Sequence, residues 1–402
     1  MKRDNFLKCR EDGNFIITAG FVHNLLKNTT PKLSFNENFN KEDFKKWQKK
    51  LIKKLKELMG ISRISNTTPQ SKIIWSKKRE KYKIEKWEIY IEGKNVVPLL
   101  ILIPDQIKYQ KKLPAVLCCP GSLHTKEQLA GEPEIKKTYA ASRHPERDKM
   151  ALWYAKAGII AIAVDNPGVG ELGECWSIEK IDYVRDLISL QLIQLGSSYL
   201  GLSVYQKIRI LDWIENLEFI DKKKIAISGH SLGTEPAMVV GVIDKRIKAL
   251  VFNDFVCNTL ERGWKVTKLE KGFRHSSLSE PIPEFPVSGL WHSIPGLWKW
   301  FDYPDILCAF APRPLLITEG GPTYNLLKIW KAYEILKSSN KVSIHYYPKY
   351  EKVRKYNNVE IPENINMKTY LKYAYVDVKN HCFKENLAIP WLLKIFGVDN
   401  KF

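Results

Sequence analysis

The 402-residue chain lacks an apolar run long enough to cross a bilayer. Its two longest runs are Val96 to Pro104 and Gly158 to Val164, whereas a membrane-spanning helix needs about twenty residues. The basic N-terminus also lacks the apolar core of a secretory signal, although a chain whose signal had been removed would look the same. We therefore expect a cytoplasmic protein with no membrane partner.

Cysteine is scarce and irregularly spaced. The seven cysteines form no CxxC pair, and no cluster of His and Cys has the spacing of a zinc site. Cys118 and Cys119 are adjacent within an apolar run, which is typical of buried thiols in a reducing compartment. Gly and Pro are near background, which excludes collagen-like and low-complexity chains. The sequence thus predicts no metal and no cofactor.

Acidic residues are outnumbered by basic ones, and the formal net charge is +20. Proteins that read phosphates and bases usually favour clustered Arg, whereas here Lys outnumbers Arg by about four to one and is spread along the chain. The densest block, Lys45 to Lys56, has the pattern of a solvated helix face. We expect no nucleic-acid partner, and the sequence carries no signature of an oligomeric state.

Aromatic residues are plentiful, with 12 Trp, 18 Tyr and 16 Phe, so the chain has ample apolar surface to bury. Residues 1–70 are polar and basic and contain one amphipathic helix, Glu42 to Met59, which Gly60 ends. We predict that residues 1–70 form a helical appendage and that residues 71–402 form the main domain.

Within the main domain, short apolar runs alternate with helical patterns, which predicts an α/β fold with a mainly parallel sheet covered on both faces. Helices are expected at Lys149–Lys156, Asp182–Leu217, Leu232–Ile243 and Leu387–Phe396. Strands are expected at Tyr82–Ile91, Val96–Ile103, Pro114–Cys119, Ile159–Asp165, Lys224–Ser228, Ile247–Asn253, Pro314–Thr318 and Val342–Tyr347.

Parallel sheets place their chemistry at the carboxyl ends of the strands. One strand ends in Gly229-His230-Ser231-Leu232-Gly233, a G-x-S-x-G sequence between a strand and a helix. Such a sharp turn needs small residues two before and two after the serine, and glycine stands at both positions. The pattern therefore predicts that Ser231 is a nucleophile.

A nucleophilic serine needs a base, and four His follow Ser231, namely His275, His292, His345 and His381. Only His381 falls in a loop beyond the last strand and before the final helix, so we predict that it is the base. The acid that orients it stays open, because Glu319 and Asp254 each end a strand after the nucleophile.

An ester carbonyl that becomes tetrahedral needs two N–H donors for its oxyanion. One is expected to be the backbone N–H of Leu232, directly after the nucleophile. The other is expected from Pro120-Gly121-Ser122, where Gly121 permits close approach and the Ser122 N–H is the preferred donor. His124, nearby, could contact either substrate or solvent.

Taken together, these motifs resemble the α/β-hydrolase superfamily, and within it the acetyl xylan esterase-like branch related to dienelactone hydrolase. The resemblance runs from about residue 44 to 396. It is carried by the segments Trp47–Gly60, Pro114–Glu127, Asp165–Glu171, Gly196–Asp212, Gly229–Gly233, Ile294–Leu297, Ala311–Pro314 and Asn380–His381 in their shared order.

The resemblance implies an α/β-hydrolase fold and hydrolysis of a carboxylic ester, often an acetyl group on a sugar, with Ser231 and His381 in the family's catalytic positions. Two departures stand out. Pro120 replaces the usual His of the oxyanion loop, and Thr323 stands about where relatives place their Asp. Glucuronoyl esterases, a sister group, carry their acid one strand earlier, where Asp254 lies here.

The segment from Cys257 to Ala309 is too long for a plain crossover and is rich in aromatic residues. We expect it to form a cap insertion over the site, with its aromatic side chains either lining a substrate pocket or packing beneath the cap. The leading interpretation is a serine esterase acting on a small-molecule ester. The alternatives are a peptidase or thioesterase of the same fold, or a non-enzymatic protein that binds through its basic surface.

Overall fold

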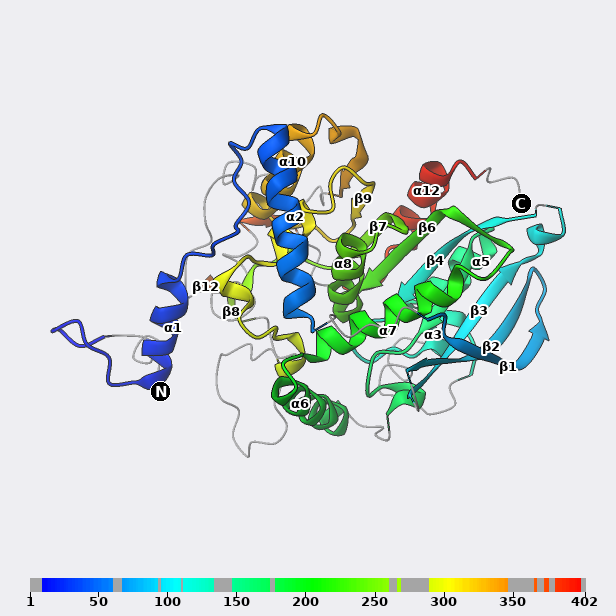
Figure 1. Cartoon of the computed structure of the whole chain (residues 1–402), viewed down its shortest axis with the longest axis horizontal. Helices are drawn as coiled ribbons and strands as arrows, with labels where there is room; N and C mark the ends of the chain where they lie inside the picture. The colour runs from blue at the N-terminus through cyan, green and yellow to red at the C-terminus, as the bar shows by residue number, and fades with distance from the viewer. Residues whose placement is uncertain are drawn as a thin grey trace.

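A nine-stranded sheet forms the centre of the computed structural model (Figure 1). The structure describes residues 9–60, 67–92, 95–109, 111–133, 147–173, 178–259, 266–268, 289–345, 365–366, 372–375 and 380–398. The strands of the main sheet are β1 (Gln70–Lys78), β2 (Tyr82–Glu92), β3 (Asn95–Pro104), β4 (Leu113–Cys119), β5 (Ile160–Val164), β6 (Ile220–His230), β7 (Ile247–Asn253), β9 (Leu315–Ile317) and β11 (Val342–Ile344).

The sheet is mixed but mostly parallel. Its spatial order is β1-β2-β3-β5-β4-β6-β7-β9-β11, with parallel pairing from β5 to β11 and antiparallel pairing from β1 to β5. The parallel strands are mostly apolar and buried, because helices cover both of their faces, except at the polar start of β6 and in the half-buried edge strand β11. Two short ladders lie outside this sheet, β10 (Gly321–Pro322) with β13 (Ala374–Tyr375), and β8 (Val266–Lys268) with β12 (Ile365–Asn366).

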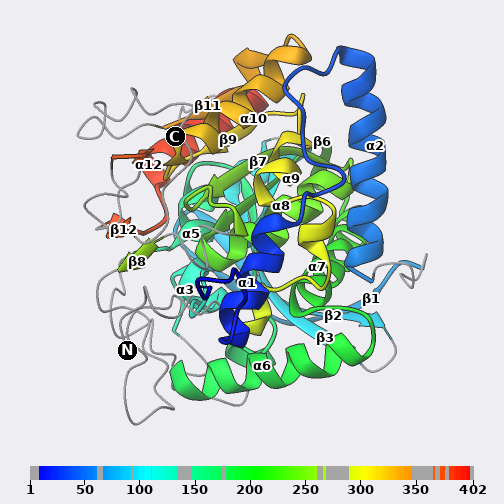
Figure 2. The same ribbon diagram turned by 90° about the vertical axis from the view of Figure 1, so that its left-hand side faces the viewer.

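Helices pack against the sheet in two layers, each with its own apolar core. One core is shared by α2 (Lys41–Leu58), α7 (Tyr199–Ile214), α8 (Thr234–Ile243), α9 (Tyr303–Cys308) and α10 (Thr323–Ile335). The other is shared by α3 (Lys126–Ala130), α5 (Met150–Lys156) and α12 (Glu385–Phe396). Figure 2 shows α2 towards the right of the view and α3, α5 and α12 towards the left. The predicted mainly parallel sheet with helices on both faces is therefore confirmed.

The N-terminal region contributes to the main core. Helix α2 begins after Asn40, whose side chain accepts hydrogen bonds from two amides of the first turn, a common N-cap arrangement. Its buried face includes Phe44, Trp47 and Leu51, which join the core on the α8 side of the sheet. The helix α1 (Thr18–Asn28) precedes it and is less integrated, with Phe21 half exposed.

Several elements differ from the sequence prediction. The expected helix over Asp182–Leu217 is two helices, α6 (Ile178–Gln194) and α7, bent by 88° at a break where Gly196 has a φ of +71° and Ser198 caps the second helix. The edge strand β1 was not predicted, because its largely exposed, Lys-rich sequence lacks an apolar face. The strand β11 ends at Ile344, one residue before His345. About half of the predicted cap insertion, residues 260–265 and 269–288, falls outside the described residues.

No single helix in the described ranges has the length and apolar character needed to cross a membrane. The bent pair formed by parts of α6 and α7 meets that test only in combination. Helix α7 is buried along most of its length against α8 and β2, as expected for a core helix.

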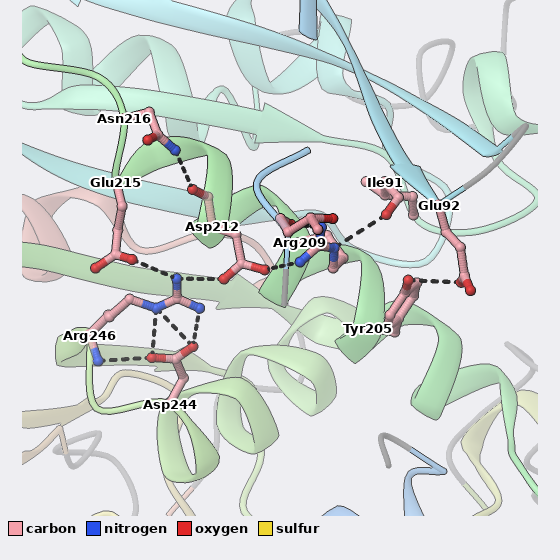
Figure 3. Close-up of polar contacts among 10 residues, drawn as sticks. Ile91, Glu92, Tyr205, Arg209, Asp212, Glu215, Asn216, Asp244 and Arg246 are labelled. Atoms are coloured by element: carbon pink, nitrogen blue, oxygen red, sulfur yellow. Dashed lines mark hydrogen bonds and ion pairs between the residues drawn. The ribbon is translucent and has the colours of Figure 1, made fainter. Parts of the chain in front are cut away.

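A buried arginine joins α7 to the edge of the sheet (Figure 3). Arg209 Nε donates to the carbonyl of Ile91 at 3.2 Å, Nη2 donates to the carbonyl of Thr67, and Nη1 binds Asp212. The other oxygen of Asp212 binds Arg246 at 2.7 Å, and Arg246 also binds Asp244. The network thus ties two helices and two strand ends together.

Removing Arg209 should destabilise the fold more than removing its neighbour. Arg209→Met leaves the carbonyls of Ile91 and Thr67 and one oxygen of Asp212 without this donor, and we expect it to lower the free energy of unfolding by about 3 kcal/mol. Arg246→Met is the matched control, because that side chain is more exposed (21%) and should cost about 1 kcal/mol. Urea unfolding of both variants measures the difference, and equal midpoints would contradict this account.

Candidate active site

Ser231 lies at the carboxyl end of β6 in a strained turn. Its φ is +51°, a left-handed conformation that is uncommon for residues other than glycine. A Cβ added at Gly229 would lie 2.5 Å from the carbonyl oxygen of Gly233, and one added at Gly233 would lie 2.2 Å from the carbonyl oxygen of Cys119. Both glycines are therefore needed for the turn, as the sequence pattern predicted.

His381 and Glu319 come from the carboxyl side of the sheet and contact each other. His381 Nδ1 lies 2.8 Å from Glu319 Oε2, so that Nδ1–H can donate to the carboxylate and leave Nε2 for another partner. Glu319 lies two residues after the end of β9 and is fully buried. Its second oxygen, Oε1, lies 3.4 Å from Lys384 Nζ. A buried carboxylate thus holds the imidazole in one orientation.

Asp254, the other candidate acid, lies at the end of β7 and makes different contacts. Its Oδ1 accepts from the Phe255 N–H at 2.7 Å, and its Oδ2 lies 3.5 Å from Thr234 Oγ1. Phe255 in turn lies against His381, with 5.3 Å between ring centroids. Of the two carboxylates left open by the sequence, Glu319 is the one that contacts His381 Nδ1.

The loop of His381 is fixed by a buried asparagine at the end of β7. Asn253 Nδ2 donates to the carbonyl of Cys382 at 3.0 Å, and Asn253 Oδ1 accepts from the Lys384 N–H at 2.7 Å. The His381 ring also lies beside His230, the residue before Ser231, at 5.0 Å between centroids. No hydrogen bond joins Ser231 to His381 among the described residues, and such contacts often shorten only when substrate binds.

The loop after β4 is held through its carbonyl oxygens. Asn166 Nδ2 donates to Pro120 O at 3.1 Å and to Gly121 O at 3.0 Å, and Arg185 donates to Ser122 O. In a trans peptide the N–H points opposite to the carbonyl of the preceding residue. The Ser122 N–H is therefore directed away from Asn166, and it meets no acceptor within the described part of the chain.

The other expected donor is the backbone N–H of Leu232. Leu232 follows Ser231 in a short 3₁₀ helix that continues into α8. Amide groups in the first turn of a helix have no acceptor within that helix, so the Leu232 N–H is available to an external oxygen. The loops that carry Ser122 and Leu232 approach closely, because Gly233 lies against the carbonyl of Pro120.

The charge around His381 favours its protonated form. Burial alone would lower the pKa of His381, but the hydrogen bond to Glu319 and the charges of Glu319 and Asp254 outweigh burial and raise that pKa to about 9. A base must be neutral to accept a proton, so this site should gain activity as the pH rises towards that value.

The pH dependence of kcat/KM tests this directly, because it reports groups of the free enzyme. If Ser231 and His381 act together, kcat/KM should rise from about pH 7, reach half of its maximum near the pKa of about 9 for His381, and level off only above about pH 10. Stopped assays with an uncharged ester over pH 5 to about 10 would measure it. A midpoint at or below the ordinary histidine value of about 6.5 would show that the pKa of His381 is not raised.

Three further polar residues surround the site without having been predicted as site residues. Asp148 and His230 are buried, and Asn166 orients the loop after β4. Asn166 follows a strand end, a position that could have suggested it, whereas Asp148 follows no expected strand. His124 contacts Asp148 rather than solvent alone, with 3.2 Å between His124 Nε2 and Asp148 Oδ2.

A further carboxylate at a strand end and a further histidine have different partners. Asp165, at the end of β5, is fully paired with the buried Lys126, 2.8 Å from its Nζ. His292 binds Glu235 of α8 at 2.8 Å, and His275 lies outside the described residues. Neither Asp165 nor His292 contacts His381 in the structure's described ranges.

Among the described residues, two groups of side chains bring potential metal donors within 4.8 Å of one another, and they share His230. The first adds His124 and Asp148, and the second adds Glu319 and His381. In each group the carboxylate already contacts an imidazole, at 3.2 Å and 2.8 Å respectively. The arrangement is that of two imidazole–carboxylate pairs on either side of His230.

The chain belongs to the Abhydrolase family, whose model matches residues 4–394. It is 40% identical to a provisionally assigned acetyl xylan esterase from Bacteroides fragilis, over 98% of this chain and 99% of that one, with a TM-score of 0.84. A methylesterase matches 90% of this chain and 66% of its own at 16% identity, with a TM-score of 0.56, and this shows the fold alone. None of the curated proteins matches.

These matches confirm the α/β-hydrolase fold. They also confirm the resemblance to the acetyl xylan esterase-like branch, because the Bacteroides fragilis protein aligns over nearly the whole of both chains.

Proposed function

We propose that the protein is a serine esterase that works through an acyl-enzyme on Ser231. The observation that carries the proposal is the contact of 2.8 Å between His381 Nδ1 and the buried Glu319, beside a serine held at a φ of +51°. This constellation serves acyl transfer on several unrelated folds, and it is recognised by the geometry and roles of its members.

In the first half of the reaction, His381 Nε2 accepts the proton of Ser231 Oγ as the oxygen attacks the ester carbonyl. The N–H groups of Leu232 and Ser122 bind the oxyanion that forms. Glu319 stabilises the imidazolium, which then protonates the leaving alcohol. The products of this half are the free alcohol and an ester of Ser231.

In the second half, His381 accepts a proton from water as the water attacks the acyl-enzyme. The tetrahedral intermediate collapses, the proton returns to Ser231 Oγ, and the carboxylic acid leaves. Every proton is carried by His381, so no step of this scheme calls for a cofactor.

We further propose that the acyl group is small, with an acetyl ester of a carbohydrate as the preferred class of substrate. The relative from Bacteroides fragilis supports the class. The packing of Leu232, the residue after the nucleophile, with the buried Tyr199 and Trp291 supports the small size of the acyl group. Such packing leaves little room for a long acyl chain.

A series of p-nitrophenyl esters tests both parts of the proposal. We expect acetate to be hydrolysed at least about tenfold faster than butyrate in kcat/KM, because an added methylene pair must displace packed side chains. Acetylated xylo-oligosaccharides should release acetate, and matched peptide and thioester substrates should react far more slowly. Faster cleavage of the peptide or the thioester would replace the esterase assignment by one of those activities.

A further inference from the structure

Three imidazoles, of His381, His230 and His124, lie in a row that begins at the catalytic base. A second buried carboxylate, that of Asp148, lies beside them. The ring centroids of His124 and His230 are 5.7 Å apart, and those of His230 and His381 are 5.0 Å apart. Asp148 Oδ2 lies 3.2 Å from His124 Nε2, and its Oδ1 lies 3.6 Å from His230 Nδ1. The Asp148 side chain is only 6% exposed and lies outside the catalytic scheme given above.

The same carboxylate also binds the backbone next to the base. Its Oδ1 accepts from the Phe383 N–H at 2.6 Å, two residues beyond His381. Asp148 therefore contacts His124, in the segment that follows the Ser122 turn, and the loop that carries His381. A single carboxylate joins the two loops that must keep their relative positions for proton transfer and oxyanion binding to coincide.

The imidazoles in turn lie against the oxyanion loop. A Cβ added at Gly121 would lie 2.7 Å from His124 Nδ1 and 3.1 Å from His230 Nδ1, so both rings touch the backbone of Gly121. His230 Nδ1 has no hydrogen-bond partner within the described residues, and Asp148 is the carboxylate that it faces. A displacement of the Asp148 side chain would therefore move the rings of His124 and His230, and these rings contact the backbone of Gly121.

The backbone of Asp148 is also strained. Its φ is +65°, and only two other described non-glycine residues have a positive φ, Ser231 and Lys337. Strain of this kind persists where the surroundings hold the residue firmly, and it gathers at functional sites. In this protein the contacts with His124 and with the Phe383 N–H keep Asp148 in this conformation.

We propose that Asp148 is a positioning residue for the esterase reaction, which fixes the loop of His381 against the oxyanion loop and adds its negative charge to the field that stabilises the His381 imidazolium. The proposal rests on the proposed function. It assigns to Asp148 no contact with substrate and no proton transfer. The carboxylate acts through His124, His230 and Phe383.

Several charged groups face His381 besides Asp148. Glu319 and Asp254 add negative charge from the ends of β9 and β7 and, like Asp148, raise the pKa of His381. Lys384, directly before α12, contributes a positive charge that opposes these negative charges, since its Nζ lies 3.4 Å from Glu319 Oε1. His230 is held neutral, because burial lowers its pKa to about 3. Asp148 stays ionised, because the contacts with His230 and His124 outweigh burial and lower its pKa.

The variant Asp148→Asn removes the charge and keeps an acceptor for the Phe383 N–H. We expect kcat to fall by about tenfold to a hundredfold with little change in KM, because the interactions lost matter most in the transition state. Losing a nearby negative charge makes the imidazolium less stable. The pKa of His381, and with it the acidic limb of the pH–rate profile, should therefore move to lower pH by about half a unit or more.

The titration of His381 followed by NMR gives a readout that needs no substrate. A lowered pKa of His381 in Asp148→Asn supports the charge role even if the true substrate is not an ester, which separates this proposal from the proposed function. Asp221→Asn is the matched control, since Asp221 is the second residue of β6 and lies at the end of the strand opposite Ser231. It should leave both the pKa and kcat unchanged.

A folded Asp148→Asn protein with wild-type kcat and an unmoved pKa of His381 would overturn the proposal. A fall in kcat without any change in that pKa would overturn its electrostatic part and leave a structural role only. Should Asp148→Asn fail to fold, His124→Gln carries the test. That variant interrupts the link to the oxyanion loop, and it should lower kcat while leaving the pKa of His381 within about 0.3 units.

Discussion

Replacing Ser231 by Ala should lower kcat for p-nitrophenyl acetate by at least about ten-thousand-fold, to the residual rate that binding and the oxyanion donors alone provide. The alanine side chain removes the only atom that forms the acyl-enzyme. It leaves the turn in place, because the methyl group is smaller than the hydroxymethyl group that it replaces. Initial rates for the wild type and the variant, corrected for spontaneous hydrolysis, measure the loss.

A serine variant elsewhere controls for general effects of the substitution. Ser71 lies exposed on the edge strand β1, and Ser71→Ala should keep the wild-type rate within about twofold. Comparable esterase activity in Ser231→Ala and the wild type would remove Ser231 from the mechanism. The esterase hypothesis would then be wrong, and the data would favour a peptide substrate or a binding role for the basic surface.

Replacing Glu319 by Gln should have the second largest effect, a loss of about a hundredfold to ten-thousand-fold in kcat. The amide can still accept from His381 Nδ1–H, but it no longer carries the charge that stabilises the imidazolium. The pKa of His381 should fall from about 9 towards the ordinary histidine value, because the largest favourable contribution to its protonated form is lost. The acidic limb of kcat/KM should move to lower pH with it.

The matched variant is Asp254→Asn, which changes the other strand-end carboxylate in the same way. Asp254 contacts Phe255 and Thr234 rather than the His381 ring nitrogen, so we expect a loss of less than about tenfold. The reverse ranking, with Asp254→Asn nearly inactive and Glu319→Gln nearly normal, would assign the acid to Asp254. The site would then have to rearrange when substrate binds.

The sequence was sufficient wherever the evidence is local. The turn around Ser231 could be predicted because Gly229 and Gly233 stand two residues away on each side, between a strand and a helix. The Leu232 N–H followed from its position after the nucleophile. Helix α2 could be predicted from its apolar spacing, since Phe44, Trp47 and Leu51 lie on one face.

Contacts between residues far apart in the sequence could not be predicted in this way. Glu319 and Asp254 end neighbouring strands, and which of them meets His381 depends on the path of a loop 62 residues further along the chain from Glu319. Asp148 follows no strand at all and reaches the site through tertiary packing. The break between α6 and α7 was missed because the apolar pattern continues across it, although Gly196 marks its place.

The covalent intermediate is the central claim, and mass spectrometry tests it most directly. The enzyme is mixed with excess p-nitrophenyl acetate, quenched in acid within the first turnovers, digested and mapped. This account predicts an acetyl group on the peptide that contains Ser231, absent from Ser231→Ala, with more of it retained in the Glu319→Gln variant if that substitution slows deacylation more than acylation. Rapid turnover with no acetyl group on Ser231, or with the group on another residue, would contradict it.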